Sequence, residues 1–202
     1  MNAIVHAAHS PWRSYLQEAK CEALRMLREP AFCLPVIGFP VLFYLLFGVL
    51  LDKGEGKAAQ YLLATYGAFG VIGAGLFGFG VSIAVDREKG LLRLKRALPV
   101  PPGALLLAKM VMAMSFAAII SLVLAVIAAT VAGVALEPSQ WIRLFVIDVL
   151  GVLPFCAIGL YVGSLVGGNA APALINMLYL PMAFLSGLWL PLTLLPGILS
   201  TI

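Results

Sequence analysis

The fold is decided by residues 31–51, AFCLPVIGFPVLFYLLFGVLL, a run of 21 residues that contains no charged side chain. As an α-helix rising about 1.5 Å per residue, this run covers roughly 30 Å, the thickness of the hydrocarbon core of a bilayer. Pro35 and Pro40 are expected to bend the helix without ending it, because prolines are tolerated in membrane spans. The run therefore predicts a transmembrane helix.

Four more apolar stretches predict further spans at residues 61–85, 105–136, 141–166 and 172–189. Lys109, near the start of the third span, is expected to snorkel to the membrane surface. Of all residues, 62% are hydrophobic and 11% charged, against roughly 25% charged in a soluble domain. This composition excludes a soluble enzyme, a disordered chain and a nucleic-acid binder. We predict an all-α polytopic membrane helix bundle with five transmembrane helices in one domain, residues 31–202.

Residues 1–30 form a separate N-terminal region and predict an amphipathic interfacial helix. Ser10 and Pro11 suit the N-cap and the first helical position. Apolar residues then recur every three or four positions, and basic residues lie mostly off that stripe, as in helices that lie in the surface of a membrane. A helix packed on the protein's own loops is the alternative. The stripe consists of Trp12, Tyr15, Leu16, Ala19, Ala23, Met26 and Leu27.

The distribution of positive charge predicts the orientation. Ten of the thirteen Lys and Arg residues belong to the N-terminal region, to residues 86–103 or to Lys109, and the positive-inside rule places these in the cytoplasm. Residues 190–202 are apolar but interrupted by prolines, which predicts an interfacial or re-entrant segment on the outer side. Five spans with an apolar end lead us to expect that a sixth span is missing.

Small residues in the second span predict a helix-packing face. Gly73, Gly75 and Gly78 spell a literal G-x-G-x-x-G, but a dinucleotide site needs a preceding strand, which a membrane helix does not supply. Instead, Gly70, Ala74 and Gly78 recur every four residues, and small residues at this spacing allow close approach of another helix.

Two polar residues inside predicted spans are candidates for a transport pathway. Asp148 is an acid inside a span, which by default marks a functional site, although an interfacial structural role is the alternative. Asn176, in the fifth span, is expected to form an interhelical hydrogen bond. The three cysteines show no metal-binding or redox spacing, and no catalytic set of side chains is present. We predict neither a metal site nor an enzyme.

The loop at residues 86–103 mixes charges with leucines and ends in prolines. It predicts a short amphipathic helix beneath the membrane that docks in the groove of a partner; a solvated basic loop is the alternative. Its residues are similar to the first cytoplasmic loop of the transmembrane subunit of type-2 ABC exporters, on Asp86-Arg87-Glu88-Lys89-Gly90 and Leu98-Pro99-Val100-Pro101. The end of the fifth span resembles the outer Ser-Gly-x-x-x-Pro…Leu-Pro stretch of that family, on Ser186, Gly187, Trp189, Pro191 and Pro196.

With the order of the spans, the resemblance covers essentially the whole chain, and it implies a permease subunit in the bacterial inner (plasma) membrane. The permease would pair with a second permease copy, as a homodimer or a heterodimer. A cytoplasmic P-loop ATPase would bind ATP and Mg, since this sequence contains no G-x-x-x-x-G-K-[ST]. The resemblance assigns ATPase coupling to Arg87, Glu88, Lys89, Gly90, Leu91, Leu94, Leu98 and Pro99.

The substrate expected from the resemblance is hydrophobic or amphiphilic, such as a drug, an antibiotic or a lipid-like molecule. Two other functions stay open. A secondary transporter coupled to protons or ions would use Asp148 and work without an ATPase. A non-transporting membrane assembly subunit would give no flux in either case.

Overall fold

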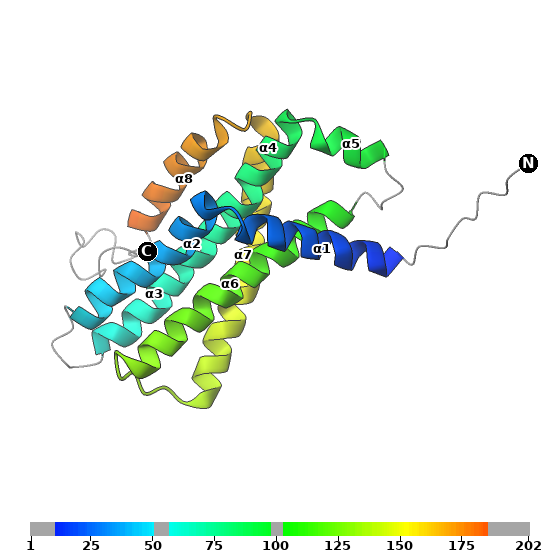
Figure 1. The fold of residues 1–202 in the computed structure, drawn as a ribbon. Helices are drawn as coiled ribbons and strands as arrows, with labels where there is room; N and C mark the ends of the chain where they lie inside the picture. Colours follow the sequence, from blue (N-terminus) through cyan, green and yellow to red (C-terminus); the bar gives the residue numbers. More distant parts are fainter. Residues whose placement is uncertain (1–10, 51–56, 98–102, 186–202) are drawn as a thin grey trace, which may run out of the picture.

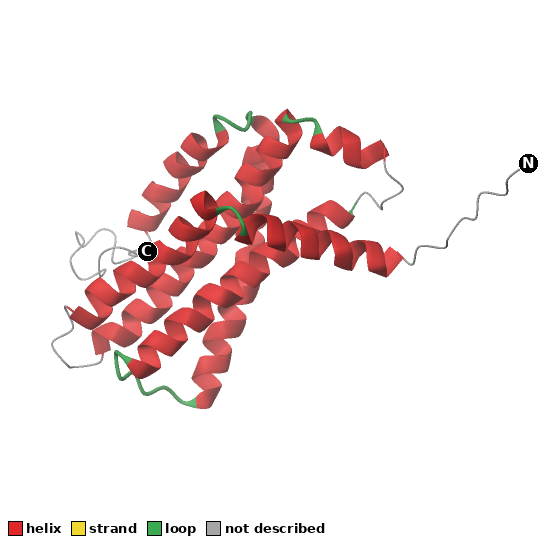
Figure 2. Ribbon diagram, in the orientation of Figure 1, coloured by secondary structure: helices red, strands yellow, loops and turns green. Residues whose placement is uncertain are grey.

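The computed structural model describes residues 11–50, 57–97 and 103–185, and these residues form helices joined by short turns, without a strand (Figure 2). Two segments are π-helical: Tyr44–Leu50 continues the helix that starts at Pro30, and Ala74–Val81 joins the helix Lys57–Gly73 to the helix Ser82–Glu88. The helices are α1 (Pro11–Leu27), α2 (Pro30–Phe43), α3 (Lys57–Gly73), α4 (Ser82–Glu88), α5 (Leu91–Ala97), α6 (Ala104–Thr130), α7 (Pro138–Leu165) and α8 (Ala171–Leu185).

Four of the described helices are long and apolar enough to cross a membrane, and a fifth apolar helix, Ala171–Phe184, is shorter. The protein is therefore an all-α polytopic membrane bundle, which confirms the predicted fold class. The four are Pro30–Leu50, Ala58–Glu88, Ala104–Thr130 and Pro138–Leu165, with 21, 31, 27 and 28 residues.

Two helix ends differ from the sequence prediction. The second span continues to Glu88, so Asp86 to Glu88 are helical and not part of the loop. The third span ends at Thr130, short of residue 136, and the chain then turns at Gly133, whose φ of +63° is a left-handed conformation that glycine adopts readily. Hydrophobicity alone predicts neither end. Charged residues continue the helix of the second span to Glu88, and apolar residues follow Thr130 in a non-helical conformation.

The second span lies at the centre of the bundle and contacts α2, α6, α7 and α8. α1 lies across α6, and α5 projects from the end of α4 (Figure 1). α1, α5, the start of α6 and the α7–α8 turn lie at one end of the bundle, which we call the α1 end. The α6–α7 connection lies at the opposite end (Figure 1).

Candidate functional site

α5 leaves the second span through a turn at Gly90. This residue has φ +72°, and no atom lies within 4 Å of the position that a Cβ would occupy. The backbone conformation, not a lack of space, therefore favours glycine. On α5 the side chain of Leu94 is 61% exposed, and Arg93 is also exposed. The helix thus presents a leucine and a cation away from the bundle. Leu98 and Pro99 lie outside the described residues.

A buried ionic cluster fixes α1 and α6 to the end of the second span. The side chain of Lys109 is 0% exposed; its Nζ lies 2.8 Å from Oδ2 of Asp86, contacts the carboxylate of Glu22 and donates a hydrogen bond of 3.0 Å to Ser82 Oγ. The prediction that Lys109 snorkels was therefore wrong, because two buried carboxylates replace the hydration of its ammonium group. Arg25 donates to Oδ1 of Asp86 at 2.9 Å.

The apolar stripe of α1 divides between the bundle and the surface. Met26 is buried and Ala23 packs against the core, whereas Leu16 and Leu27 are exposed. Glu22, which the sequence analysis missed as a site residue, lies one turn from Met26 on the buried face. Its spacing of four from Met26 was the signal in the sequence.

A second ion pair joins α1 to α5. Lys95 contacts the carboxylate of Glu18. Partial burial lowers the pKa of Lys95, and the positive charge of Lys109 lowers it further. For Arg25, burial acts to lower the pKa, but the hydrogen bond and charge of Asp86 outweigh it and raise that pKa. Three acids and three bases thus balance each other at the α1 end: Glu18, Glu22, Asp86, Arg25, Lys95 and Lys109.

Arg87 and Glu88 contact the α7–α8 turn. Arg87 donates hydrogen bonds to the carbonyls of Ser164 and Val166, the latter at 3.0 Å, and a cation suits the C-terminal end of a helix. The carboxylate of Glu88 accepts a hydrogen bond from the N–H of Gly168. Both side chains therefore fix the end of the second span within the protein, while the neighbouring Lys89 is exposed. Their part in ATPase coupling stays a prediction.

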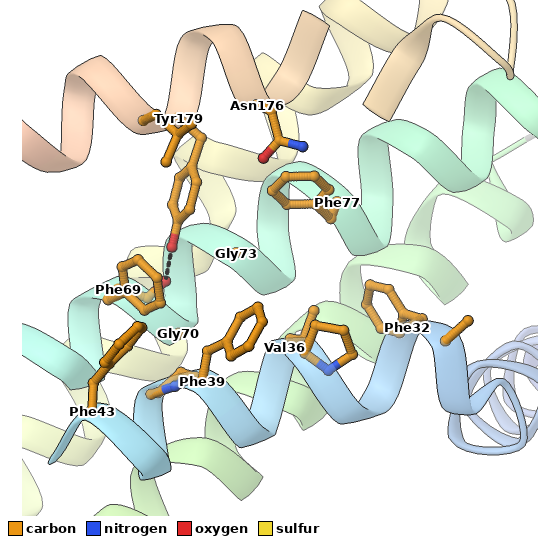
Figure 3. A pocket seen from close by; sticks show the side chains of 14 residues that line it. Phe32, Val36, Phe39, Phe43, Phe69, Gly70, Gly73, Phe77, Asn176 and Tyr179 are labelled. Carbon is orange, nitrogen blue, oxygen red and sulfur yellow. Dashed lines mark hydrogen bonds between the residues drawn. The ribbon is translucent and has the colours of Figure 1, made fainter. Parts of the chain in front are cut away.

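An apolar cavity of about 460 Å³ lies between α2, the second span and α8. Figure 3 shows Asn176 and Tyr179 extending from α8 toward Phe69 and Phe77, while α2 lines the opposite side. The Tyr179 hydroxyl donates a 3.1 Å hydrogen bond to the carbonyl of Phe69, so that it is already engaged. Six aromatic rings line the cavity, from Phe32, Phe39, Phe43, Phe69, Phe77 and Tyr179.

The lining of the cavity contains no charged side chain. It has two polar side chains, those of Tyr179 and Asn176, and Figure 3 marks a hydrogen bond for Tyr179 alone. A pocket of this kind favours an uncharged, largely apolar molecule, because a charge would lose its hydration there without a partner. A few polar groups then set the orientation of the ligand.

The small residues predicted to allow close approach of another helix lie against side chains of α6 and α2. A Cβ on Gly70 would lie 2.7 Å from Ile120, one on Gly78 would lie 2.9 Å from Phe32, and Ala74 is buried. A Cβ on Gly163, however, would lie 2.4 Å from the backbone oxygen of Gly80. Sequence reasoning missed this crossing, although the G-x-x-x-G formed with Gly159 signalled it.

Asp148 and Asn176 are not brought together. Asp148, on α7, is 5% exposed and does not line the cavity. Its Oδ2 lies 3.0 Å from where a Cβ on Gly67 would be, and neither that oxygen nor Ser121 Oγ has a hydrogen-bond partner among the described residues. Asp148 therefore packs between α7 and α3 and does not line the cavity that Asn176 lines.

The predicted outer segment lies outside the described residues, with Ser186, Gly187, Trp189, Pro191 and Pro196. Within residues 11–50, 57–97 and 103–185, no three His, Cys, Asp or Glu side chains gather as they would around a metal ion.

A multi-pass helical bundle with an apolar cavity between its helices suits a protein that binds apolar molecules within a membrane. A model of the ABC-2 type transporter family matches residues 16–202, and the chain therefore belongs to the ABC-2 transporter permease family. It is similar to a protein of Bacillus subtilis (strain 168) with the name "Putative transport permease YvfS", at 26% identity over 191 residues, which cover 92% of this chain and 77% of that protein. No solved structure matches the chain.

Proposed function

We propose that this permease is the membrane subunit of an ATP-driven exporter for hydrophobic or amphiphilic molecules. The observation that carries the proposal is the presentation of α5, whose Leu94 is 61% exposed at the end of the bundle that holds most of the positive charge. A leucine exposed on a short helix outside the spans is suited to the groove of a protein partner.

The partner that we propose is a cytoplasmic P-loop ATPase, which binds ATP and Mg. Membership of the ABC-2 family implies such a subunit. The sequence contains no G-x-x-x-x-G-K-[ST], so ATP hydrolysis is assigned to the partner. In this arrangement the N-terminus and α5 face the cytoplasm of a bacterial cell, and a second permease copy completes the translocation pathway.

The aromatic cavity is the substrate site that we propose. Its volume of about 460 Å³ is that of a drug-sized ligand site. It is lined by the first, second and fifth apolar helices, so that a relative movement of these helices would change its shape. Uncharged aromatic compounds and the apolar parts of lipids fit this lining.

The first experiment is co-purification in mild detergent, with mass spectrometry of the proteins that elute. The wild-type chain and Leu94→Met are expected to retain a P-loop ATPase, and Leu94→Asp is expected to lose it, because a carboxylate cannot enter an apolar groove without a partner. Retention of the ATPase by Leu94→Asp would contradict docking through α5. Elution of a folded wild-type chain without any ATPase would contradict the proposed function.

A further inference from the structure

α1 makes charged contacts with two parts of the molecule that an ATPase would have to move relative to each other. Glu18 contacts Lys95 on α5, and Glu22 contacts Lys109 on α6. The two acids are four residues apart and therefore lie on the same face of α1, one above the other. One helix thus contacts both the docking helix and α6, and its Arg25 also pairs with Asp86 at the end of the second span, at 2.9 Å.

The two contacts of α1 differ in burial, and this difference gives them different mechanical roles. In the pair of Glu22 and Lys109, the side chains are 4% and 0% exposed, and Asp86 lies 2.8 Å from the same ammonium. A buried pair of this kind does not separate readily, because each charge would be left without water or a partner. α1 and the start of α6 therefore move together.

The pair of Glu18 and Lys95 is more exposed, with side chains that are 22% and 35% accessible. It links α1 to a short helix that joins α4 at Gly90, where the left-handed backbone leaves open space around the glycine. At Gly90 a change in the angle of α5 would therefore meet no packed neighbour of the glycine, and the ion pair is a charged contact of α5 with α1. Neither residue contacts the cavity.

We propose that Glu18 and Lys95 are positioning residues for energy coupling: their ion pair transmits the movement of α5 through α1 to α6. This inference rests on the proposed function, since the ATPase supplies the movement. α1 is then a mechanical part of the permease in addition to a helix at the membrane surface. To transmit the movement, the pair needs one positive and one negative side chain, and either α1 or α5 can carry the positive one.

The experiment is a charge exchange in the complex of permease and ATPase, reconstituted in lipid nanodiscs. Spin labels are placed at the exposed Cys21 of α1 and at Leu165→Cys, an exposed position at the end of α7, after replacement of Cys33 and Cys156 by Ser. The distance between the labels is measured without nucleotide and with ATP plus vanadate. In the otherwise unchanged complex we expect two distances, with nucleotide favouring one of them.

Lys95→Glu and Glu18→Lys are each expected to reduce the nucleotide-dependent shift in population by about fivefold, the size of effect that the loss of a partly exposed ion pair produces. The double exchange, Glu18→Lys with Lys95→Glu, is expected to restore the shift. Lys20→Glu, at an exposed position of α1, is the control for the charge reversal in Lys95→Glu, and Gln17→Lys is the control for a positive charge added to α1 beside Glu18.

A full shift in both single variants would overturn the transmission role of the pair, as would a double exchange that stays defective although ATPase co-elutes and hydrolyses ATP. Loss of ATPase from the single variants alone would also overturn it, because the pair would then serve docking. If no ATPase elutes with the unchanged permease, the proposed function itself fails, and this inference with it.

Discussion

The ammonium group of Lys109 lies 2.8 Å from the carboxylate of Asp86, although the two residues are 23 positions apart in the sequence and α5 lies between them. Both side chains are at least 97% buried. The contact joins α4, which precedes α5 in the chain, to α6, which follows it. The two spans between which α5 lies in the chain are thereby fixed to each other.

Lys109→Met is expected to destabilise the protein, because it leaves Asp86 and Glu22 buried without their ammonium partner. Removal of one member of a buried ion pair typically costs about 3–5 kcal/mol. The measurement is thermal unfolding in detergent followed by fluorescence. Lys20→Met, an exposed change on α1, is the control and should leave the unfolding temperature nearly unchanged. Equal stability of the two variants would show that the cluster contributes nothing.

Gly163→Ala is expected to weaken the crossing of α7 with the second span. The new Cβ would lie 2.4 Å from the backbone oxygen of Gly80, and a backbone atom cannot move aside as a side chain can. Overpacking of this kind costs about 1–3 kcal/mol. Gly151→Ala, on the same helix with no atom within 4 Å of its Cβ position, is the matched control and should be neutral or stabilising. A Gly163→Ala protein that unfolds at the wild-type temperature would contradict the close crossing.

The sequence predicts the spans well because a membrane helix is recognised from the composition of one continuous stretch of residues. The uncharged run at residues 31–51 corresponds to the observed helix Pro30–Leu50. The predicted N-terminal helix corresponds to α1, which the structure describes from Pro11 onward. The class of protein also follows from local residues, since the motif from Asp86 to Gly90 is continuous in the chain.

The contacts of that same motif could not be predicted from the sequence. Asp86 faces Lys109, whereas Arg87 and Glu88 face the α7–α8 turn, and these partners depend on the rotation of helices that are apolar on nearly all sides. A weak amphipathic pattern gives little information about rotation. The cavity was missed for the same reason, because its aromatic residues come from three helices that are distant in sequence.

Gly90→Ala is expected to reduce the coupling of ATP hydrolysis to transport while the spans remain folded. A φ of +72° costs a residue with a Cβ about 1–2 kcal/mol, so α5 would take up another angle. Gly90→Asn should be milder, since asparagine visits this conformation more readily. Gly103→Ala, at φ −81°, is the control. Co-elution of the ATPase measures docking, and transport per ATP hydrolysed measures coupling; a wild-type ratio in Gly90→Ala would contradict the role of the turn.

Gly73→Leu is expected to fill the aromatic cavity and to block ligand binding. Gly73 lines the cavity, and its Cβ position has only the Tyr179 hydroxyl within 4 Å, at 3.9 Å, so the leucine can extend into the space. Labelling by a benzophenone photoprobe, which is uncharged and aromatic, should fall at least about tenfold, the effect of losing about 1.4 kcal/mol of binding. Gly38→Leu, on α2 in open space away from the lining, is the control. Unchanged labelling of cavity peptides in Gly73→Leu would place the site elsewhere.

Asp148→Asn is expected to leave ATP-dependent transport and its pH profile unchanged. The amide has nearly the size of the carboxyl, and Asp148 lies against Gly67 and outside the cavity, so the substitution removes a titrating group without changing the substrate site. The measurement is flux into inverted vesicles at several pH values, with and without ATP. An ion-coupled transporter would instead show flux without ATPase, and Asp148→Asn would abolish it. Asp148→Leu also changes the shape of the side chain that packs against Gly67, so it should lower stability while the pH profile of the remaining flux stays the same.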